Sequence, residues 1–366
     1  MSFFKKLFQK EPAKTIQTNE EFWAWFVERE QAFFSAVQAG TSIREDFVQP
    51  VYEKLNELRH ECYSLLVGRS NEEQVHFIIS AEGVVKNFVF AEDLIQEAPV
   101  LENWKFTALK PAIDIQDTGI RMAEVEFTKE KIKFYPDEVE GYPDLIALKI
   151  THADFTEEQK DLISNGVYIY LDHLLGERNF TSIVDQIEVV SEASIQEQLV
   201  PIEKITDYLT WRQKEFVEKY KGHRSATEED EHTVFESSLR SGNTAFATLN
   251  TELLRWDSKA SHPWMLTIKI EYDTKRDDGL PDEGVQEELD RLEDLFREEL
   301  KDSEGYLNIG RETGDWLREI YFACQETDWC SRKVDEIIRA YEGAFKLEYD
   351  IHKDKYWKSL ERYQIT

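Results

Sequence analysis

Residues 264–272 read WMLTIKIEY, and this stretch decides the fold of the C-terminal part of the chain. Large apolar side chains stand at every second position, namely Trp264, Leu266, Ile268, Ile270 and Tyr272. Alternate side chains of a β-strand point to the same face of a sheet, so this spacing predicts a strand with one buried face.

The elements after this strand follow in a recognisable order. Residues 282–302 carry apolar side chains at helical spacing, which predicts a helix with a buried stripe of Val285, Leu289, Leu292, Phe296 and Leu300. Two strands joined by a tight turn at Gly314-Asp315, a second helix ended by Gly343 and a last strand are predicted at residues 306–313, 317–324, 329–342 and 345–351. The order is β-α-β-β-α-β, the pattern of ferredoxin-like sandwiches, in which two helices cover one face of a four-stranded antiparallel sheet.

Helical and strand patterns alternate in the N-terminal part. A capping box at Thr18 to Glu21 opens a helix predicted over residues 19–38. Further helices are predicted at residues 44–59, before Pro99, from Asp154 or Thr156 to Gly176, and at 205–220. Strands are predicted at residues 63–67, 75–80, 104–109, 120–127, 132–135, 145–151 and 182–190. We therefore expect an α+β protein of two domains, whose N-terminal domain has a topology that the sequence leaves open.

A polar stretch suggests where the two domains meet. Residues 221–233 contain almost no apolar side chain, which is typical of an exposed linker. We expect a flexible basic amphipathic tail at residues 1–17, an N-terminal α+β domain at 18–220, the linker at 221–233 and a ferredoxin-like domain at 234–366. The tail combines four apolar residues with lysines, which fits a weak membrane contact or a solubilising tail, and the acidic remainder of the chain favours the second.

The charge of the chain limits what it binds. Lys and Arg number 44 against 74 Asp and Glu, a formal net charge of -30. Such a field repels nucleic-acid phosphates and anionic lipids and attracts a basic partner. Residues 1–233 hold 25 basic and 44 acidic side chains, and residues 234–366 hold 19 and 30, so both parts are acidic.

The same sequence places the protein in the cytoplasm and gives no cofactor. Only three cysteines occur, Cys62, Cys324 and Cys330, without the spacing of a zinc site or a disulfide framework, which favours a reducing compartment. No apolar run has the length of a membrane span. The carboxylate-rich loop at residues 273–283 departs from the EF-hand pattern, because Lys275 stands at the third position and Asp278 where the sharp-turn glycine belongs. We predict no metal, no cofactor and no catalytic residue.

Two residues were considered for chemistry. His173, beside Asp172, is a candidate for acid–base work, and Cys330, near a helix N-terminus, for a lowered thiol pKa. The sequence favours a structural role for both residues. His173 is then a helix residue beside a polar partner, and Cys330 is an unreactive thiol. Cys324 alternates with Ile320 and Phe322 and is expected to be buried.

The helix at residues 282–302 is the candidate binding element. It holds 10 acidic and 3 basic side chains, and the acids continue into its last turns, beyond what the helix dipole favours. A solvated face explains such a helix, and so does a surface that docks cations of another protein. The candidate partner-binding residues are Asp277, Asp278, Glu287, Glu288, Glu298 and Glu299.

Several motifs resemble known families. Residues 277–282 (DDGLPD), 305–313 (GYLNIGRET) and 318–322 (REIYF) resemble a bacterial family of domains of unknown function, which is distantly similar to regulator of ribonuclease E activity B, a ferredoxin-like inhibitor. This resemblance covers residues 234–366. Residues 22–26 (FWAWF), 80–83 (SAEG), 98–99 with Trp104, and 171–177 (LDHLLGE) resemble an uncharacterised bacterial domain often joined to it. The resemblance implies bacterial origin and a protein-binding role.

The leading hypothesis is a non-enzymatic bacterial regulator or adaptor that binds a basic protein surface, for example on a nuclease or another RNA-handling protein. The alternatives are an immunity-type protein that neutralises a basic toxin, and a hydrolase with a site between the domains.

Overall fold

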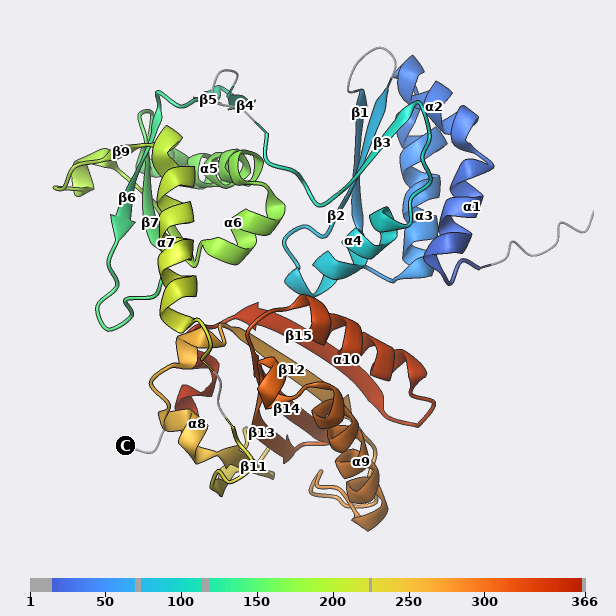
Figure 1. Ribbon diagram of the computed structural model, residues 1–366, viewed down its shortest axis with the longest axis vertical. Coiled ribbons are helices and arrows are strands. Elements are labelled where there is room, and N and C mark those ends of the chain that lie inside the picture. Colours follow the sequence, from blue (N-terminus) through green and yellow to red (C-terminus); the bar gives the residue numbers. More distant parts are fainter. Residues whose placement is uncertain (1–14, 70–73, 114–118, 224–225, 364–366) are drawn as a thin grey trace, which may run out of the picture. The chain divides into compact units, whose positions relative to one another are not determined.

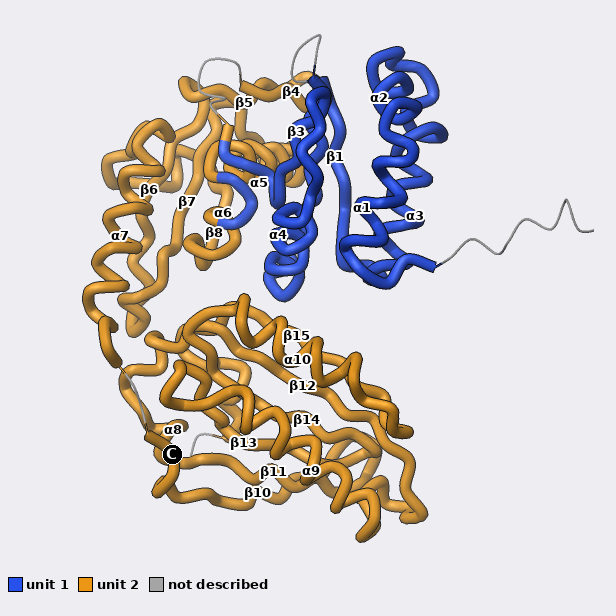
Figure 2. Tube along the Cα trace, turned by 45° about the vertical axis from the view of Figure 1, so that its right-hand side comes forward, with its two compact units in different colours: residues 1–112, 176–178 blue, residues 113–175, 179–366 orange. Residues whose placement is uncertain are grey.

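The computed structural model describes residues 15–69, 74–113, 119–223 and 226–363, and combines helices and strands in an α+β arrangement (Figure 1). The chain forms two compact units, which Figure 2 colours separately. Unit 1 comprises residues 1–112 with 176–178, and unit 2 comprises residues 113–175 with 179–366. The predicted linker at 221–233 lies inside unit 2, and its last two residues belong to a strand.

Residues 1–14 of the tail predicted at residues 1–17 lie outside the described residues. Ile16, which the sequence placed in this tail, is buried, and its amide donates to Oε2 of Glu57 (3.2 Å). Within the described ranges, no helix has both the length and the apolar composition that a membrane-spanning helix needs.

Unit 1 packs helices against a three-stranded sheet of order β1-β2-β3. Strands β1 and β2 are antiparallel, and β2 and β3 are parallel. The elements in chain order are α1 (Asn19–Val27), α2 (Glu30–Ala39), the π-helical turn η1 (Arg44–Val48), α3 (Gln49–Leu58), β1 (Ser64–Arg69), β2 (Val75–Ser80), η2 (Val85–Asn87), α4 (Phe88–Gln96) and β3 (Trp104–Ala108).

Aromatic rings fill the core of unit 1, and some of them come from two helices where the sequence predicted one. The ring of Phe26 lies 5.4 Å from Phe33, 5.8 Å from Phe77 and 5.1 Å from Trp104. The single helix predicted over residues 19–38 is in fact two helices, α1 and α2, separated at Glu28 and Arg29. Aromatic residues of both helices meet in one cluster, in which Trp25 and Phe26 of α1 contact Phe33 of α2.

The first half of unit 2 contains a four-stranded sheet of order β8-β7-β6-β9. Strand β7 is parallel to β8 and antiparallel to β6. Its elements are β4 (Ile120–Met122), β5 (Val125–Phe127), β6 (Ile132–Asp137), β7 (Ala147–His152), η3 (Glu157–Gln159), α5 (Lys160–Leu175), α6 (Glu177–Ile183), β8 (Gln186–Val190), η4 (Glu192–Ser194), β9 (Val200–Pro201), η5 (Ile202–Lys204) and α7 (Ile205–Tyr220). One apolar core, which includes Phe134, Ile150 and Tyr170, joins this sheet to α5 and α7.

Two predicted strands of this region differ from the structure. The strand predicted at 120–127 is a hairpin of β4 and β5, because the chain turns at Ala123, whose φ is +52°. Of the strand predicted at 182–190, the first two residues belong to the end of α6, and only residues 186–190 form a strand, β8.

The C-terminal sheet has six antiparallel strands in the order β10-β11-β13-β14-β12-β15. The elements are β10 (His232–Ser238), β11 (Thr244–Asn250), α8 (Thr251–Arg255), η6 (Lys259–Ser261), β12 (Trp264–Glu271), α9 (Glu283–Glu299), η7 (Asp302–Glu304), β13 (Tyr306–Gly314), β14 (Leu317–Cys324), α10 (Asp328–Ala340), β15 (Lys346–Lys353) and η8 (Lys358–Tyr363). From β12 to β15 the elements follow the predicted β-α-β-β-α-β order. The turn between β13 and β14 lies one residue later than predicted, at Asp315 and Trp316, whose φ angles are +50° and +62°.

The two faces of this sheet are covered differently. Helices α9 and α10 contact each other and lie over one face, where Leu266, Ile268 and Ile270 of β12 are fully buried (Figure 1). The other face packs Met265, Leu249 and Leu307 against α8 and η8. Strands β10 and β11 extend the sheet beyond the predicted four strands. The sequence had assigned the start of β10 to a linker.

Candidate partner-binding surface

Helix α9 begins where Asp282 caps it. One carboxylate oxygen of Asp282 accepts a hydrogen bond from the N–H of Val285 (3.2 Å) and the other from the N–H of Lys275 (3.3 Å). These two backbone hydrogen bonds lower the pKa of Asp282. A carboxylate at this position satisfies an amide that the helix leaves unpaired and interacts favourably with the helix dipole. The first predicted acid of the helix therefore has a structural role.

The inner side of α9 carries two carboxylates that the sequence did not distinguish from the outer ones. Glu293 is 5% exposed, and both its oxygens lie 2.9 Å from Nη1 of Arg311. Asp290 accepts a hydrogen bond from Nη1 of Arg318 (2.8 Å), and Arg318 is itself only 1% exposed. Nε of Arg318 also donates to the hydroxyl of Thr313 (3.0 Å). Two guanidinium groups of β13 and β14 thus match two carboxylates of α9 and attach the helix to the sheet.

The pKa values of this inner cluster follow from burial and pairing. Burial lowers the pKa of Arg318, although Asp290 and Glu293 act in the opposite direction. Burial alone would raise the pKa of Asp290, but hydrogen bonds from Arg318 and Gln286 outweigh it and hold the pKa below its ordinary value. Both groups are therefore ionised at neutral pH, and their charges cancel locally.

Three of the six predicted binding carboxylates have partners within the C-terminal part. The contacts are Asp278 with Arg276 (2.5 Å), Glu288 with the hydroxyl of Tyr341 (2.7 Å) and Glu299 with Nζ of Lys333 (3.5 Å). The hydrogen bonds from Arg276 and from the amide of Leu280 lower the pKa of Asp278 to about 2. These three residues are less available to a cation of another molecule than the sequence suggested.

The other three predicted carboxylates are exposed. No hydrogen bond or ion pair connects the carboxylate of Asp277, Glu287 or Glu298 to any other residue that the structure describes. Glu287 and Glu298 are eleven residues apart on α9, which puts them on the same side of the helix at a separation of about 16 Å along its axis. The exposed Arg291 lies between them, so the two ends of this ridge are more acidic than its middle.

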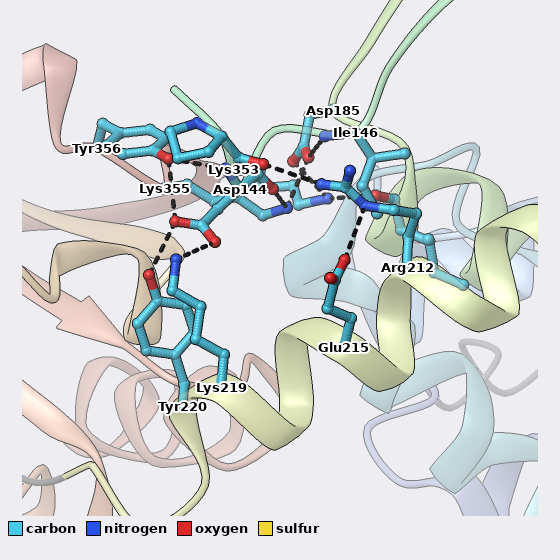
Figure 3. Close-up of polar contacts among 12 residues, drawn as sticks. Asp144, Ile146, Asp185, Arg212, Glu215, Lys219, Tyr220, Lys353, Lys355 and Tyr356 are labelled. Carbon is cyan, nitrogen blue, oxygen red and sulfur yellow. Dashed lines mark hydrogen bonds and ion pairs between the residues drawn. The ribbon is translucent and has the colours of Figure 1, made fainter. Parts of the chain in front are cut away.

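A second charged cluster, shown in Figure 3, lies where the two halves of unit 2 meet. The carboxylate of Asp144 accepts hydrogen bonds from Nζ of Lys219 (2.7 Å) and from the hydroxyls of Tyr220 (2.8 Å) and Tyr356 (3.1 Å). Nζ of Lys355 donates to the backbone carbonyl of Asp144 (2.8 Å). The loop before β7, the end of α7 and the segment after β15 are joined in this way.

The same cluster contains Asp185, which pairs with two lysines. Its oxygens lie 2.7 Å from Nζ of Lys353 and 2.6 Å from Nζ of Lys355, and it also accepts the N–H of Ile146 (2.7 Å). Burial lowers the pKa of Lys353 to about 8, against the opposing effect of Asp185. Burial also lowers the pKa of Lys355. This cluster could not be predicted from sequence spacing, because its members lie up to 212 residues apart and belong to loops and element ends.

A cavity of about 630 Å³ lies beside this cluster. It is lined by residues 137–146 and by four residues of α7, namely Arg212, Glu215, Phe216 and Lys219. Burial would raise the pKa of Asp144, but hydrogen bonds from Lys219 and from Tyr220 and Tyr356 keep it below its ordinary value. An acid held ionised by three donors is suited to binding the two halves of the unit together and poorly suited to donating a proton.

His173 and Cys330 have the positions expected for structural residues. His173 lies in the last turn of α5, and it does not belong to the lining of the 630 Å³ cavity. Cys330 is fully buried, and its Sγ donates to the carbonyl of Thr327 (3.3 Å). Burial raises the pKa of the Cys330 thiol well above its ordinary value, so the hypothesis of a lowered pKa is wrong. Cys324 is buried, as predicted.

Unit 1 brings together two of the motifs quoted from the sequence, residues 80–83 and Glu177. The carboxylate of Glu177 is 1% exposed and accepts hydrogen bonds from four donors within 3.0 Å: the hydroxyl of Ser80 and the N–H groups of Ala81, Gly83 and Lys110. These four hydrogen bonds connect the start of α6 to the end of β2 and the turn after it, and to the segment after β3. The sequence had interpreted the surrounding LDHLLGE stretch only as a helix and its end.

Among the described residues, no group of three or more His, Cys, Asp and Glu side chains has the arrangement of a metal site.

Comparison with known proteins gives a match in the C-terminal part. Residues 233–363 match the model of a family described as a family of unknown function, DUF695. The matched residues extend from β10 to the end of η8. No curated protein and no solved structure matches the chain. The six-stranded C-terminal part is thus similar to a family of unknown function, DUF695, as the motifs of residues 277–322 had indicated at this general level.

Proposed function

We propose that the protein is a non-enzymatic regulator or adaptor of the bacterial cytoplasm that binds the basic surface of a protein partner. The binding residues are the exposed carboxylates of α9 and of the loop before it. The observation that carries the proposal is that Asp277, Glu287 and Glu298 have no cationic partner among the described residues, while the inner acids Asp290 and Glu293 are matched by arginines.

The energetic argument rests on this division. Unpaired carboxylates on one helix repel each other, and a cationic surface that approaches them relieves this repulsion. Complementary charge at an exposed surface raises the association rate and disfavours wrong partners. The formal net charge of -30 strengthens the attraction at a distance and weakens it toward nucleic acid.

The fold supports binding as the mode of action. We propose that β12 to β15 with α9 and α10 form a ferredoxin-like domain, since their spatial order β13-β14-β12-β15 brings the first and third strands of the motif together at the centre. The resemblance of this region to regulator of ribonuclease E activity B favours a nuclease or another RNA-handling protein as the partner. A partner that proves to be a secreted basic toxin would support the immunity alternative instead.

The test is capture of the partner from the native host with the full chain as bait. The variant Asp277→Lys/Glu287→Lys/Glu298→Lys changes only the three exposed carboxylates. The control Glu157→Lys/Glu158→Lys/Glu197→Lys makes the same change of net charge at exposed acids elsewhere in unit 2. We expect a stoichiometric partner that the first variant loses and the control retains.

The partner identified by mass spectrometry is then purified and its dissociation constant is measured against both variants. Equal affinity for the wild type and the first variant contradicts the proposed surface. An equal loss with both variants indicates that only the net charge is recognised.

A further inference from the structure

Strands β10 and β11 present an uncovered face beside α9. Val234 of β10 and Phe246 of β11 are 63% and 37% exposed, although both belong to a six-stranded sheet. The register pairs Val234 with Thr248, and Phe246 with Glu236. These four side chains therefore share one side of the sheet, and we refer to them as the β10–β11 face.

The β10–β11 face lies on the side of the sheet that α9 and α10 cover elsewhere. Thr248 is paired with Arg311 of β13, and Phe246 with Thr313. Arg311 bonds to Glu293 of α9, so its side chain is directed to the helix side. The two outer strands thus continue the helix-covered face, and the exposure of Val234 and Phe246 shows that these side chains are not covered there. On the opposite side, Ala247 and Leu249 of β11 are buried in the core with α8 and η8.

The size of this face fits one helix. Two strands spaced by about 4.8 Å are about 10 Å wide, which is close to the diameter of an α-helix with its side chains. The seven residues of β10 extend over about 23 Å, the length of a helix of about 15 residues. Helices α9 and α10 already lie next to each other on the same side of the sheet, so a third helix would continue their layer.

The charges around the face specify the helix. Helix α9, which borders the face, carries more acidic than basic side chains, although Asp290 is paired with Arg318 (2.8 Å) and Asp294 lies 3.9 Å from Arg297. Glu236 lies within the face, and Glu228 and Glu229 are exposed just before β10. An apolar floor between acidic borders is complementary to an amphipathic helix with an apolar stripe and basic flanks.

We propose that the β10–β11 face binds an amphipathic helix of the partner protein, with its apolar side chains on Val234 and Phe246 and its Lys or Arg side chains toward α9 and Glu236. This inference rests on the proposed function, because it specifies the form in which the partner offers its basic surface. It adds an apolar contribution that the carboxylates of α9 alone do not have.

The test uses a fluorescent synthetic peptide of about 15 residues, the length of the face. Its leucines recur at helical spacing on one side, and lysines occupy the flanks. A second peptide has the same composition with the leucines distributed around the helix. Binding of both peptides to the full chain is measured by fluorescence anisotropy. The variant Val234→Ser/Phe246→Ser removes the apolar floor without changing the charge, and Val217→Ser, at an exposed apolar residue of α7, is the control.

We expect the amphipathic peptide to bind the wild type and the control equally, and the Val234→Ser/Phe246→Ser variant about tenfold more weakly, which corresponds to about 1.4 kcal/mol. The peptide with distributed leucines should bind all three proteins as weakly as the amphipathic peptide binds the Val234→Ser/Phe246→Ser variant. Equal binding of both peptides, equal binding to the floor variant, or no binding at all contradicts the inference.

These failures are distinguishable from failure of the proposed function. A partner captured by the full chain that depends on Asp277, Glu287 and Glu298 but not on Val234 and Phe246 leaves the proposed function standing and removes the helix site. Sedimentation of the wild type and of Val234→Ser/Phe246→Ser gives the remaining outcome. A dimer that the variant loses would show that a second copy of the chain covers the face, which also contradicts the inference.

Discussion

Arg318 shows at the scale of single residues how buried charge shapes the candidate site. Its guanidinium is bonded to Asp290 and Thr313 and lies 3.6 Å from Glu293, so one side chain of β14 holds two carboxylates of α9. Glu287 and Glu298 of the same helix are exposed and have no partner among the described residues. The orientation of the exposed acidic ridge therefore depends on a residue that lies inside the domain.

Replacing Arg318 by Met should destabilise unit 2. We expect the free energy of unfolding to fall by about 3 kcal/mol, because the buried Glu293 loses a nearby cation and the partly exposed Asp290 loses its hydrogen bond. The control Arg297→Met changes an exposed arginine of α9 itself and should cost less than about 1 kcal/mol. Urea unfolding followed by circular dichroism measures both changes. Similar stabilities of the two variants would show that Arg318 does not hold α9.

Lys353 gives a prediction about pH. Its pKa is about 8 in the folded protein against an ordinary value of 10.5, because burial disfavours the charged form. Between these values the unfolded chain binds more protons than the folded one, so the contribution of Lys353 to stability rises with pH and is least favourable below pH 8.

The wild type should therefore gain about 2 kcal/mol relative to Lys353→Met between about pH 7 and pH 9.5. The control Lys346→Met changes an exposed lysine of the same strand and should show no such relative change. Urea unfolding at both pH values measures the difference between the two curves. A relative change of the opposite sign would mean that the ion pair with Asp185 outweighs burial.

At the scale of elements, periodicity predicted the strands and helices with one strongly apolar side. Strand β2, helix α7 and the start of β12 have the predicted bounds, because each has a regular apolar pattern between clear end signals. Strand β10 was missed, since it is mostly polar and all its residues are exposed or only partly buried. Helix α6 was missed because it follows α5 after a single glycine.

A substitution at Gly310 would test the pairing of β11 with β13. Its φ is +132°, and a Cβ at this position would lie 2.1 Å from the carbonyl oxygen of Thr248. We expect Gly310→Ala to lower the free energy of unfolding by about 2–3 kcal/mol, from backbone strain and from the displaced strand. The control Gly284→Ala in α9 meets no close atom and should be neutral or stabilising by up to about 1 kcal/mol. Equal thermal shifts of the two variants would contradict this reading of β13.

At the scale of the whole molecule, net charge opposes folding and favours cationic partners. Raising the salt concentration from 0.01 M to 0.15 M shortens the Debye length from about 30 Å to about 8 Å and screens the repulsion that follows from the net charge of -30. A gain of about 1 kcal/mol in the free energy of unfolding should raise the thermal midpoint by about 2–4 °C. Differential scanning calorimetry in NaCl checks this. The less negative Asp277→Lys/Glu287→Lys/Glu298→Lys variant should show a smaller rise, and a midpoint that falls with salt would contradict the explanation.

The candidate surface was only partly predictable. The sequence identified α9 as the acidic helix, because helical spacing and composition are local properties. It did not separate Glu287 and Glu298, which have no partner among the described residues, from Glu288 and Glu299, whose partners are Tyr341, directly after α10, and Lys333 of α10. That distinction depends on how two helices lie next to each other, which no spacing within either helix contains.

The sequence alone determined the α+β character, the order of elements from β12 to β15 and the excess of negative charge, since each follows from composition or from a repeat within one segment. The tertiary structure decided which carboxylates are neutralised, how Asp144 and Asp185 gather lysines from distant segments, and that β10 and β11 leave an apolar face uncovered. These features depend on pairs of residues far apart in the chain, and the distance between such residues is fixed only when the elements pack.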